Sequence, residues 1–175
     1  MTKEINTMLN LKKLALIVAV ASVIVAMPLA AETHTGGAVY KITVVTQTAA
    51  STTNVVGWKS LTGAFANIAV PAGGPPQLVN VRFSAESYCT GGGGWCQVKI
   101  MDDATGIEMK PAANTNFAFD TPSSDLYEGN AMERTLVLDP GPHTIQVYFG
   151  SFSDAATFFT LDDWTLAVTQ YKNGI

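Results

Sequence analysis

The sequence predicts an all-β protein: a two-sheet β-sandwich or jelly roll, preceded by a signal peptide. Beyond residue 31, the chain consists of short runs in which apolar and polar residues alternate. Gly, Pro, Asn, Asp and Ser separate these runs. No stretch keeps a helical period long enough to outweigh its β-branched and aromatic content. Many short strands with frequent turn signals are typical of sandwiches and jelly rolls.

Residues 1–31 form the predicted signal peptide. Lys3, Lys12 and Lys13 precede an apolar run from Leu14 to Ala26, and small residues follow it up to Ala31. A basic start, a short apolar middle and a small-residue cleavage site are the features of a secretory signal. We therefore expect a secreted or periplasmic protein with no membrane attachment after cleavage. An uncleaved anchor is the alternative, because the run with its small-residue end reaches the lower limit for crossing a bilayer.

Residues 32–175 form one predicted β-sandwich domain, in which the last strand is expected to break near Asp162. The longest predicted loop is 113–130, which is rich in Asn, Ser, Pro and Asp. The expected strands lie near 38–47, 53–59, 64–70, 77–88, 96–102, 106–110, 116–119, 131–138, 143–150 and 157–170.

The chain is acidic, with 14 acidic and 10 basic residues, and three of its lysines lie in the leader. No Lys/Arg cluster is present, which argues against nucleic acid or an anionic lipid surface as a partner. The expected partner is a glycan or another protein, and a homo-oligomer is a further alternative.

Cys89 and Cys96 enclose four consecutive glycines and Trp95. In an exported protein this pair is expected to form a disulfide. Closing so small a loop contributes about 2–3 kcal/mol in the chain-entropy account. A redox-active pair is disfavoured because the spacing is not C-x-x-C.

Two hairpins are predicted from the pattern of charges and turn residues. In the first, the two cysteines face each other, so that Glu86 faces Lys99 and Arg82 faces Asp103 on one outer face, together with Ser84. The second turns at 139–142 (DPGP), where both prolines suit a loop and neither suits a central strand. The predicted core contains Ile42, Val44, Ile68, Val70, Val79, Val81, Phe83, Ile100, Leu136, Ile145, Val147 and Leu166.

If the protein has a ligand surface, we expect it around the cysteine loop, with Trp95 and Tyr88 as the contacts. The glycines leave the neighbouring backbone bare, so a flat ring could meet a sugar or a partner there. The alternative is that Trp95 packs back onto its own hairpin. Among the other aromatic residues, Tyr148 is also expected to point outward.

No residue is assigned a catalytic role. His143 is expected to cap or fill the core, because no G-x-S-x-G motif or matching nucleophile accompanies it. Paired carboxylates could hydrolyse a glycoside; the candidates are Glu86, Asp120, Glu133, Asp162 and Asp163.

No metal or cofactor is expected. A zinc site would have to combine the two cysteines with His34 and His143, and His34 lies near the predicted mature N-terminus. Calcium would need clustered carboxylates from loops, but no EF-hand spacing occurs. Ordinary solvated turns explain the acidic residues that lie close together in the sequence. The two sets considered are Asp102 and Asp103 with Glu108, and Asp162 and Asp163 with Asp154.

The string RFSAESYC at 82–89, followed by GGWC at 93–96, resembles one in small secreted bacterial proteins of unknown function. AMER at 131–134 and LDDWTL at 161–166 also resemble that group. The resemblance covers most of the mature chain and implies a compact β-sandwich with no known activity. The sandwich outline is also similar to jelly rolls of the complement and tumour-necrosis-factor type, in fold only.

These observations favour an exported, non-catalytic β-sandwich with a binding or assembly role. The alternative is a carbohydrate-binding module or lectin, with calcium assistance in one version. A small glycoside hydrolase ranks third. Binding of a sugar separates the first two, and a convergent acid pair in a cleft would favour the third.

We predict that the mature protein begins at Glu32, because the small residues 29–31 directly follow the apolar run. Intact-mass analysis of the exported protein checks this start. A species that retains Met1 in the membrane fraction would contradict it.

Overall fold

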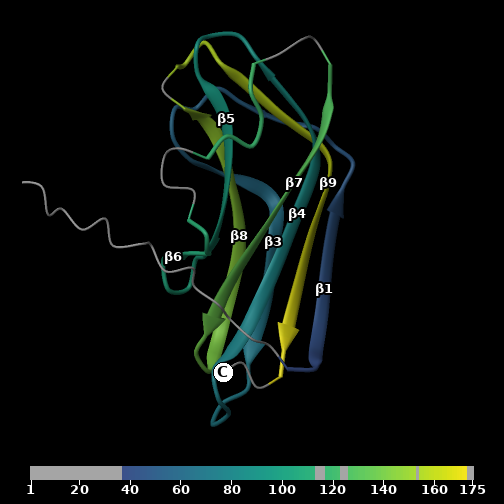
Figure 1. Ribbon diagram of the computed structural model, residues 1–175, viewed down its shortest axis with the longest axis vertical. Coiled ribbons are helices and arrows are strands. Elements are labelled where there is room, and N and C mark those ends of the chain that lie inside the picture. Colours follow the sequence, from purple (N-terminus) through teal and green to yellow (C-terminus); the bar gives the residue numbers. More distant parts are fainter. Residues whose placement is uncertain (1–36, 113–116, 123–125, 153, 173–175) are drawn as a thin grey trace, which may run out of the picture. The chain divides into compact units, whose positions relative to one another are not determined.

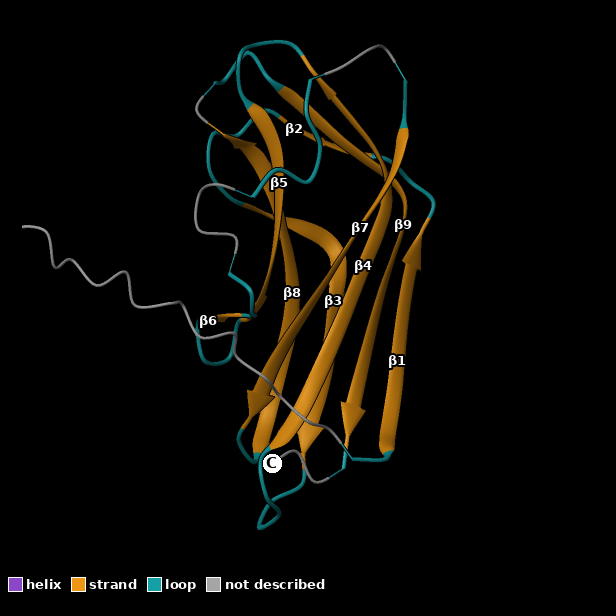
Figure 2. Ribbon diagram, viewed as in Figure 1, coloured by secondary structure: helices purple, strands orange, loops and turns teal. Residues whose placement is uncertain are grey.

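The computed structural model describes residues 37–112, 117–122, 126–152 and 154–172. The predicted leader lies outside these residues, so its cleavage stays a prediction. The described chain folds into two antiparallel sheets and contains no helix, which confirms the all-β, two-sheet prediction (Figures 1 and 2). Within these ranges, no helix is long and apolar enough to cross a membrane.

Each sheet mixes strands from distant parts of the chain. Sheet A contains, in spatial order, β1 (Val39–Gln47), β9 (Phe158–Tyr171), β4 (Gln77–Thr90) and β7 (Glu128–Leu138), and β2 (Ser51–Thr53) also pairs with β9. Sheet B contains, in spatial order, β3 (Lys59–Val70), β8 (Gly141–Phe152), β5 (Trp95–Asp102) and β6 (Ile107–Glu108).

Most predicted strands are confirmed, with ends that differ by a few residues. The strand predicted at 53–59 is wrong, because β2 ends at Thr53, Val56 makes only an isolated bridge to Ser151, and β3 begins at Lys59. At 117–119, the described part of another predicted strand, no strand forms. The expected break near Asp162 is a register shift within a continuous β9, where Asp163 adopts a left-handed φ of 42°.

The core lies between the two sheets. Nine of the twelve predicted core residues are buried, and Leu136 packs against them half-buried. Ile42 and Val44 are wrong predictions, because 59% and 57% of their surfaces are exposed. β1 carries apolar residues on both faces, and Thr43 and Val45 are the half-buried ones. The nine buried residues are Ile68, Val70, Val79, Val81, Phe83, Ile100, Ile145, Val147 and Leu166.

The first predicted hairpin is wrong, because β4 and β5 belong to different sheets. Glu86 faces Gly129 on β7 and Asp162 on β9, whereas Lys99 faces Tyr148 on β8. Arg82, Ser84 and Glu86 therefore do not share a face with Lys99 and Asp103. Turn residues mark a change of direction, but they do not decide whether the next strand pairs with the previous one.

The second predicted hairpin is wrong for the same reason. Residues 139–142 lead from β7 in sheet A to β8 in sheet B. Leu138 pairs with Gln77, and His143 pairs with Ile68. Both remain buried because alternation along each strand still directs them inward.

The predicted disulfide between Cys89 and Cys96 is confirmed, and its Cα atoms lie 5.9 Å apart. It joins β4 to β5 and therefore links the two sheets. The glycine segment between the cysteines packs against residues 154–157. A Cβ at Gly92, where φ is 34°, would overlap the Asp154 carboxylate. Asp154 Oδ2 also accepts a hydrogen bond of 3.0 Å from Gly93 N–H.

We predict that replacing both cysteines with alanine lowers the free energy of unfolding by about 2–3 kcal/mol, because the unfolded chain is no longer closed into a loop. Urea denaturation of the double variant and the oxidised wild type checks this loss. Equal stability of the two proteins would contradict it.

Candidate functional site

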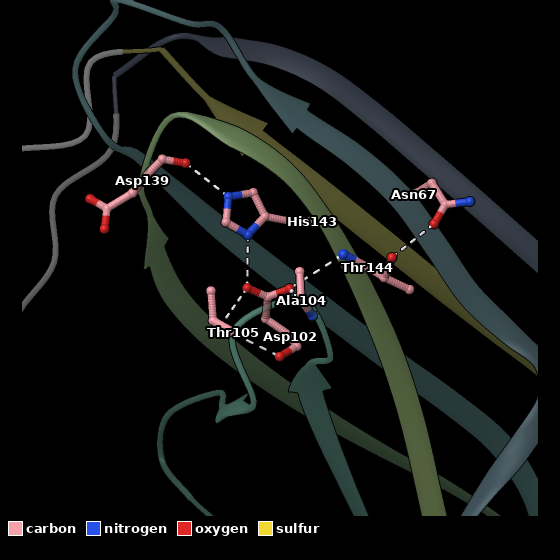
Figure 3. Close-up of polar contacts among 7 residues, drawn as sticks. All are labelled: Asn67, Asp102, Ala104, Thr105, Asp139, His143 and Thr144. Carbon is pink, nitrogen blue, oxygen red and sulfur yellow. Dashed lines mark hydrogen bonds and ion pairs between the residues drawn. The ribbon is translucent and has the colours of Figure 1, made fainter.

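Asp102 and His143 form a buried polar pair where β5 ends and β8 begins (Figure 3). His143 Nδ1 lies 2.7 Å from Asp102 Oδ2, and Nε2 lies 2.8 Å from the carbonyl oxygen of Asp139. Both ring nitrogens therefore face oxygen atoms of the protein. Because neither nitrogen faces a nucleophile, the geometry supports the expected structural role.

Asp102 also receives hydrogen bonds from its own turn. The Thr105 hydroxyl donates at 2.7 Å and Ala104 N–H at 3.2 Å, while Thr144 N–H donates from β8 at 3.3 Å. Burial raises the pKa of Asp102. The hydrogen bonds from Thr105 and His143, the charge of His143 and the Thr144 bond together lower this pKa by more than burial raises it. The pKa of Asp102 therefore lies below its ordinary value, and the ionised side chain ties the 102–106 turn to β8.

A second cluster lies on the outer face of sheet B and consists of Trp58, Lys99, Asp103 and Tyr148. We call it the aromatic–lysine cluster. Lys99 points outward because its neighbours on β5 face the core. Its Nζ lies 4.8 Å from the centre of the Trp58 ring and 5.4 Å from that of Tyr148, within cation–π range.

The Tyr148 hydroxyl donates to the Asp103 carboxylate, 3.0 Å from each oxygen. Burial, followed by the bond to Asp103 and its negative charge, raises the pKa of Tyr148. The hydroxyl therefore stays protonated at neutral pH. Asp103 N–H in turn donates to Thr144 O at 2.8 Å, so the buried Asp102 network and the outer cluster share one turn.

The loop before β3 holds Trp58 in place. Gly57 N–H donates to Ser151 O at 3.0 Å, and Ser151 N–H donates to Val55 O at 2.9 Å. The Gln97 side-chain amide donates to Gly57 O at 3.4 Å. A Cβ at Gly150 would overlap the Gly57 carbonyl oxygen, so the glycine at 150 lets this loop lie against sheet B.

A half-open cavity of about 230 Å³ lies between β2 and β3. Its lining side chains provide four hydroxyl groups, one ammonium group, one aromatic ring and no carboxylate. Ser60 in this lining is the cross-strand partner of Tyr148 in the aromatic–lysine cluster, whereas Lys59 pairs with Phe149, and Ser51 and Thr52 belong to β2 of sheet A. The lining residues are Ser51, Thr52, Lys59, Ser60, Thr62 and Phe149.

A bulge in β3 accompanies the cavity. The pairing of β3 with β8 shifts between Ser60 and Phe65. The Gln146 side chain fills the gap by donating to the carbonyl oxygens of Leu61 at 3.0 Å and Ala64 at 3.2 Å. Main-chain acceptors that the bulge leaves unpaired are thereby satisfied.

The two ligand contacts expected from the sequence lie on different sheets. Trp95 on β5 stacks on Phe152, with ring centres 4.0 Å apart. Tyr88 on β4 packs against Tyr127, with ring centres 5.5 Å apart. The structure therefore does not bring them into one surface, and ligand binding by either ring stays a prediction. Trp95 does pack onto the protein, but on β8 rather than on its own hairpin.

Sequence reasoning placed Tyr148, Lys99 and Asp103 facing outward, but it did not single out Trp58 or Lys59 and did not bring Lys99 together with Tyr148. The outward position of Lys99 follows from its place between two apolar residues of a strand. For Trp58, the available signal was a tryptophan in a polar loop.

Among the described residues, no three His, Cys, Asp or Glu side chains converge to hold a metal ion. Asp102 is engaged by His143, and Asp154 by the glycine segment. Backbone N–H groups of Ala156 and Gly93 lower the pKa of Asp154. Of the carboxylates considered for glycoside hydrolysis, Glu86 and Asp162 are cross-strand partners in sheet A.

No family model matches the sequence, and no curated protein matches it. Among solved structures, the dimeric latent PorU from Porphyromonas gingivalis is similar, with a TM-score of 0.47 and 12% sequence identity. The match covers 81% of this chain and 14% of the PorU chain, so this chain spans a small part of that protein's length. A likeness at this level carries no argument about function.

We predict that His143→Gln lowers the free energy of unfolding by about 1–3 kcal/mol, because it removes a hydrogen-bond partner of a buried carboxylate. Urea denaturation measures this loss. An unchanged midpoint would show that the pair does not stabilise the fold.

The contribution of Asp102 is predicted to depend on pH. Because folding lowers its pKa, the stability from the ionised form is present above the unfolded value of about 3.9 and is lost as the pH falls through the folded value. The stability difference between wild type and Asp102→Asn should therefore shrink between about pH 5 and pH 2. A difference that stays constant over this range contradicts the assignment.

Proposed function

We propose that this protein is an exported, non-catalytic β-sandwich module that binds an acidic polysaccharide, such as one containing uronic acids. The observation that carries the proposal is the aromatic–lysine cluster on the outer face of sheet B, together with a hydroxyl-lined cavity between β2 of sheet A and β3 of sheet B. The support comes from the chemistry of these side chains.

The side chains match the groups that a sugar presents. Trp58 and Tyr148 are half-buried, and aromatic rings of this kind pack against apolar surfaces while their polar atoms contact water. The C–H face of a sugar ring is such a surface. The hydroxyl groups of Ser51, Ser60 and Thr62 both donate and accept hydrogen bonds, as sugar hydroxyl groups require.

The charges favour an anionic sugar. Lys59 lines the cavity and Lys99 lies between the two rings of the cluster. The chain as a whole is acidic, and each of these two ammonium groups offers a positive charge to a ligand. An ammonium group forms charge-assisted hydrogen bonds with a carboxylate. A uronic acid therefore fits this surface better than a neutral sugar does.

Export is supported by the disulfide and by the predicted leader. A disulfide persists in an oxidising compartment, which is where extracellular polysaccharides are found. The absence of catalysis is supported by the buried His143, both of whose nitrogens face acceptors within the protein.

The strand order supports a jelly roll as the finer description of the sandwich. Sheet A has the order β1-β9-β4-β7, sheet B has the order β3-β8-β5-β6, and every strand pairing is antiparallel. Two antiparallel sheets joined by repeated crossings from one sheet to the other are the arrangement of the jelly roll.

We predict that Trp58→Ala weakens binding to polygalacturonate by about 2- to 10-fold, because a stacked ring contributes about 0.5–1.5 kcal/mol beyond its buried area. Lys59→Ala should weaken binding to the same polymer, whereas Arg82→Ala, exposed on β4 of sheet A, should not. Affinity electrophoresis or calorimetry, with and without EDTA, measures these changes.

Two results would contradict the proposal. Equal binding of a neutral polymer such as dextran would remove the argument from charge. Failure to bind any polysaccharide in a screen that includes acidic polymers would remove the proposed ligand class altogether.

A further inference from the structure

The edges of the two sheets differ in how they are protected. Unpaired strand edges pair with other chains unless they are short, bulged, charged or covered. The outer edge of β7 is bridged at Thr135, which exchanges two main-chain hydrogen bonds of 2.8 Å with Lys110, and β7 carries three charged residues, Glu128, Glu133 and Arg134. β6 is two residues long and β2 is three, while β3 is interrupted by its bulge.

β1 lacks such protection over most of its length. A bulge lies between Val39 and Lys41, but from Lys41 to Gln47 the strand follows β9 in unbroken register. Lys41 is the single charged residue of β1. Ile42 and Val44 are largely exposed, and Figure 2 shows β1 at the margin of sheet A, with no strand of the described residues beyond it.

We propose that β1 pairs antiparallel with β1 of a second copy of this chain, so that two copies of sheet A join into one continuous sheet. Such a pair has a two-fold axis perpendicular to the sheet. Residues that face each other across the axis must lie on the same face of the sheet. Because side chains alternate along β1, two such residues are both odd-numbered or both even-numbered, and the sum of their numbers is even. The regular segment of β1 is centred on Val44, which places the axis there.

This register is self-complementary. Val44 meets its own symmetry mate, and Ile42 meets Thr46, so apolar and β-branched side chains face each other as cross-strand pairs. Lys41 meets Gln47, and the two copies of Lys41 lie six residues apart along the strands, about 20 Å. The pairing therefore satisfies the free backbone groups of β1 without bringing like charges together.

The inference is independent of the proposed ligand, because it concerns sheet A and leaves the outer face of sheet B free. A dimer formed in this way would carry two copies of the aromatic–lysine cluster. A polymer could then be held at both, which strengthens binding through effective concentration.

Sedimentation equilibrium of the mature protein tests the pairing. We expect wild type to dimerise and Val44→Lys to raise the dissociation constant by about tenfold or more, because two like charges then meet at the axis. Ile107→Lys is the matched control: it places the same charge at an exposed apolar position of β6, at the far end of sheet B from β3, and should leave the dimer intact. A wild type that is monomeric at every concentration, or a Val44→Lys variant that dimerises as wild type does, would overturn the proposal.

A cross-linking experiment gives a second test if Val44→Lys does not fold. At the axis, Val44→Cys should form a disulfide-linked dimer on oxidation, because facing Cα atoms of antiparallel strands lie about 4.5–5.5 Å apart. Arg82→Cys, exposed on the central strand β4 of the same sheet, should stay monomeric on a non-reducing gel. Equal cross-linking of both variants, or none at Val44→Cys, would overturn the register.

Discussion

The structure depends on the crossing from β4 to β5, where the chain leaves sheet A and enters sheet B. The Cys89–Cys96 disulfide closes this crossing and is buried at the boundary between the sheets. The glycines between the cysteines allow the crossing to pack against 154–157, where a Cβ at Gly92 would overlap Asp154. β5 then carries Lys99 and Asp102, so the disulfide helps to position both the outer cluster and the buried pair.

The buried and exposed polar groups are coupled through one turn. Asp102 points into the protein toward His143, and Asp103 points outward toward Tyr148. Because the ionised Asp102 ties this turn to β8, the position of Asp103 follows from the buried network. The histidine therefore supports the proposed binding surface by fixing its backbone, and this role requires no proton transfer to a ligand.

Alternation of apolar residues was sufficient to locate most strands and nine core residues, because the period of two fixes which side chains face inward. It could not distinguish a hairpin from a crossing between sheets. Glu86 and Lys99 seemed to match because both strands alternate with a period of two. Any register of the two strands that aligns their inward-facing residues also aligns their outward-facing charged residues. Alternation failed at Ile42 and Val44 because β1 has apolar residues on both faces. The aromatic–lysine cluster joins residues 58, 99 and 148, and only the pairing of β5 with β8 and the packing of the loop before β3 bring them together.

The central claim is that the outer face of sheet B around Trp58 is the ligand surface. The most direct test is an NMR titration of the isotopically labelled mature protein with an oligogalacturonate. We expect chemical-shift changes to concentrate in 51–62, 99–103 and 146–150, together with the Trp58 indole N–H, and to be small in β1 and β7. Changes centred on β1, on Tyr88 or on Trp95, or no changes at millimolar ligand, would contradict the account.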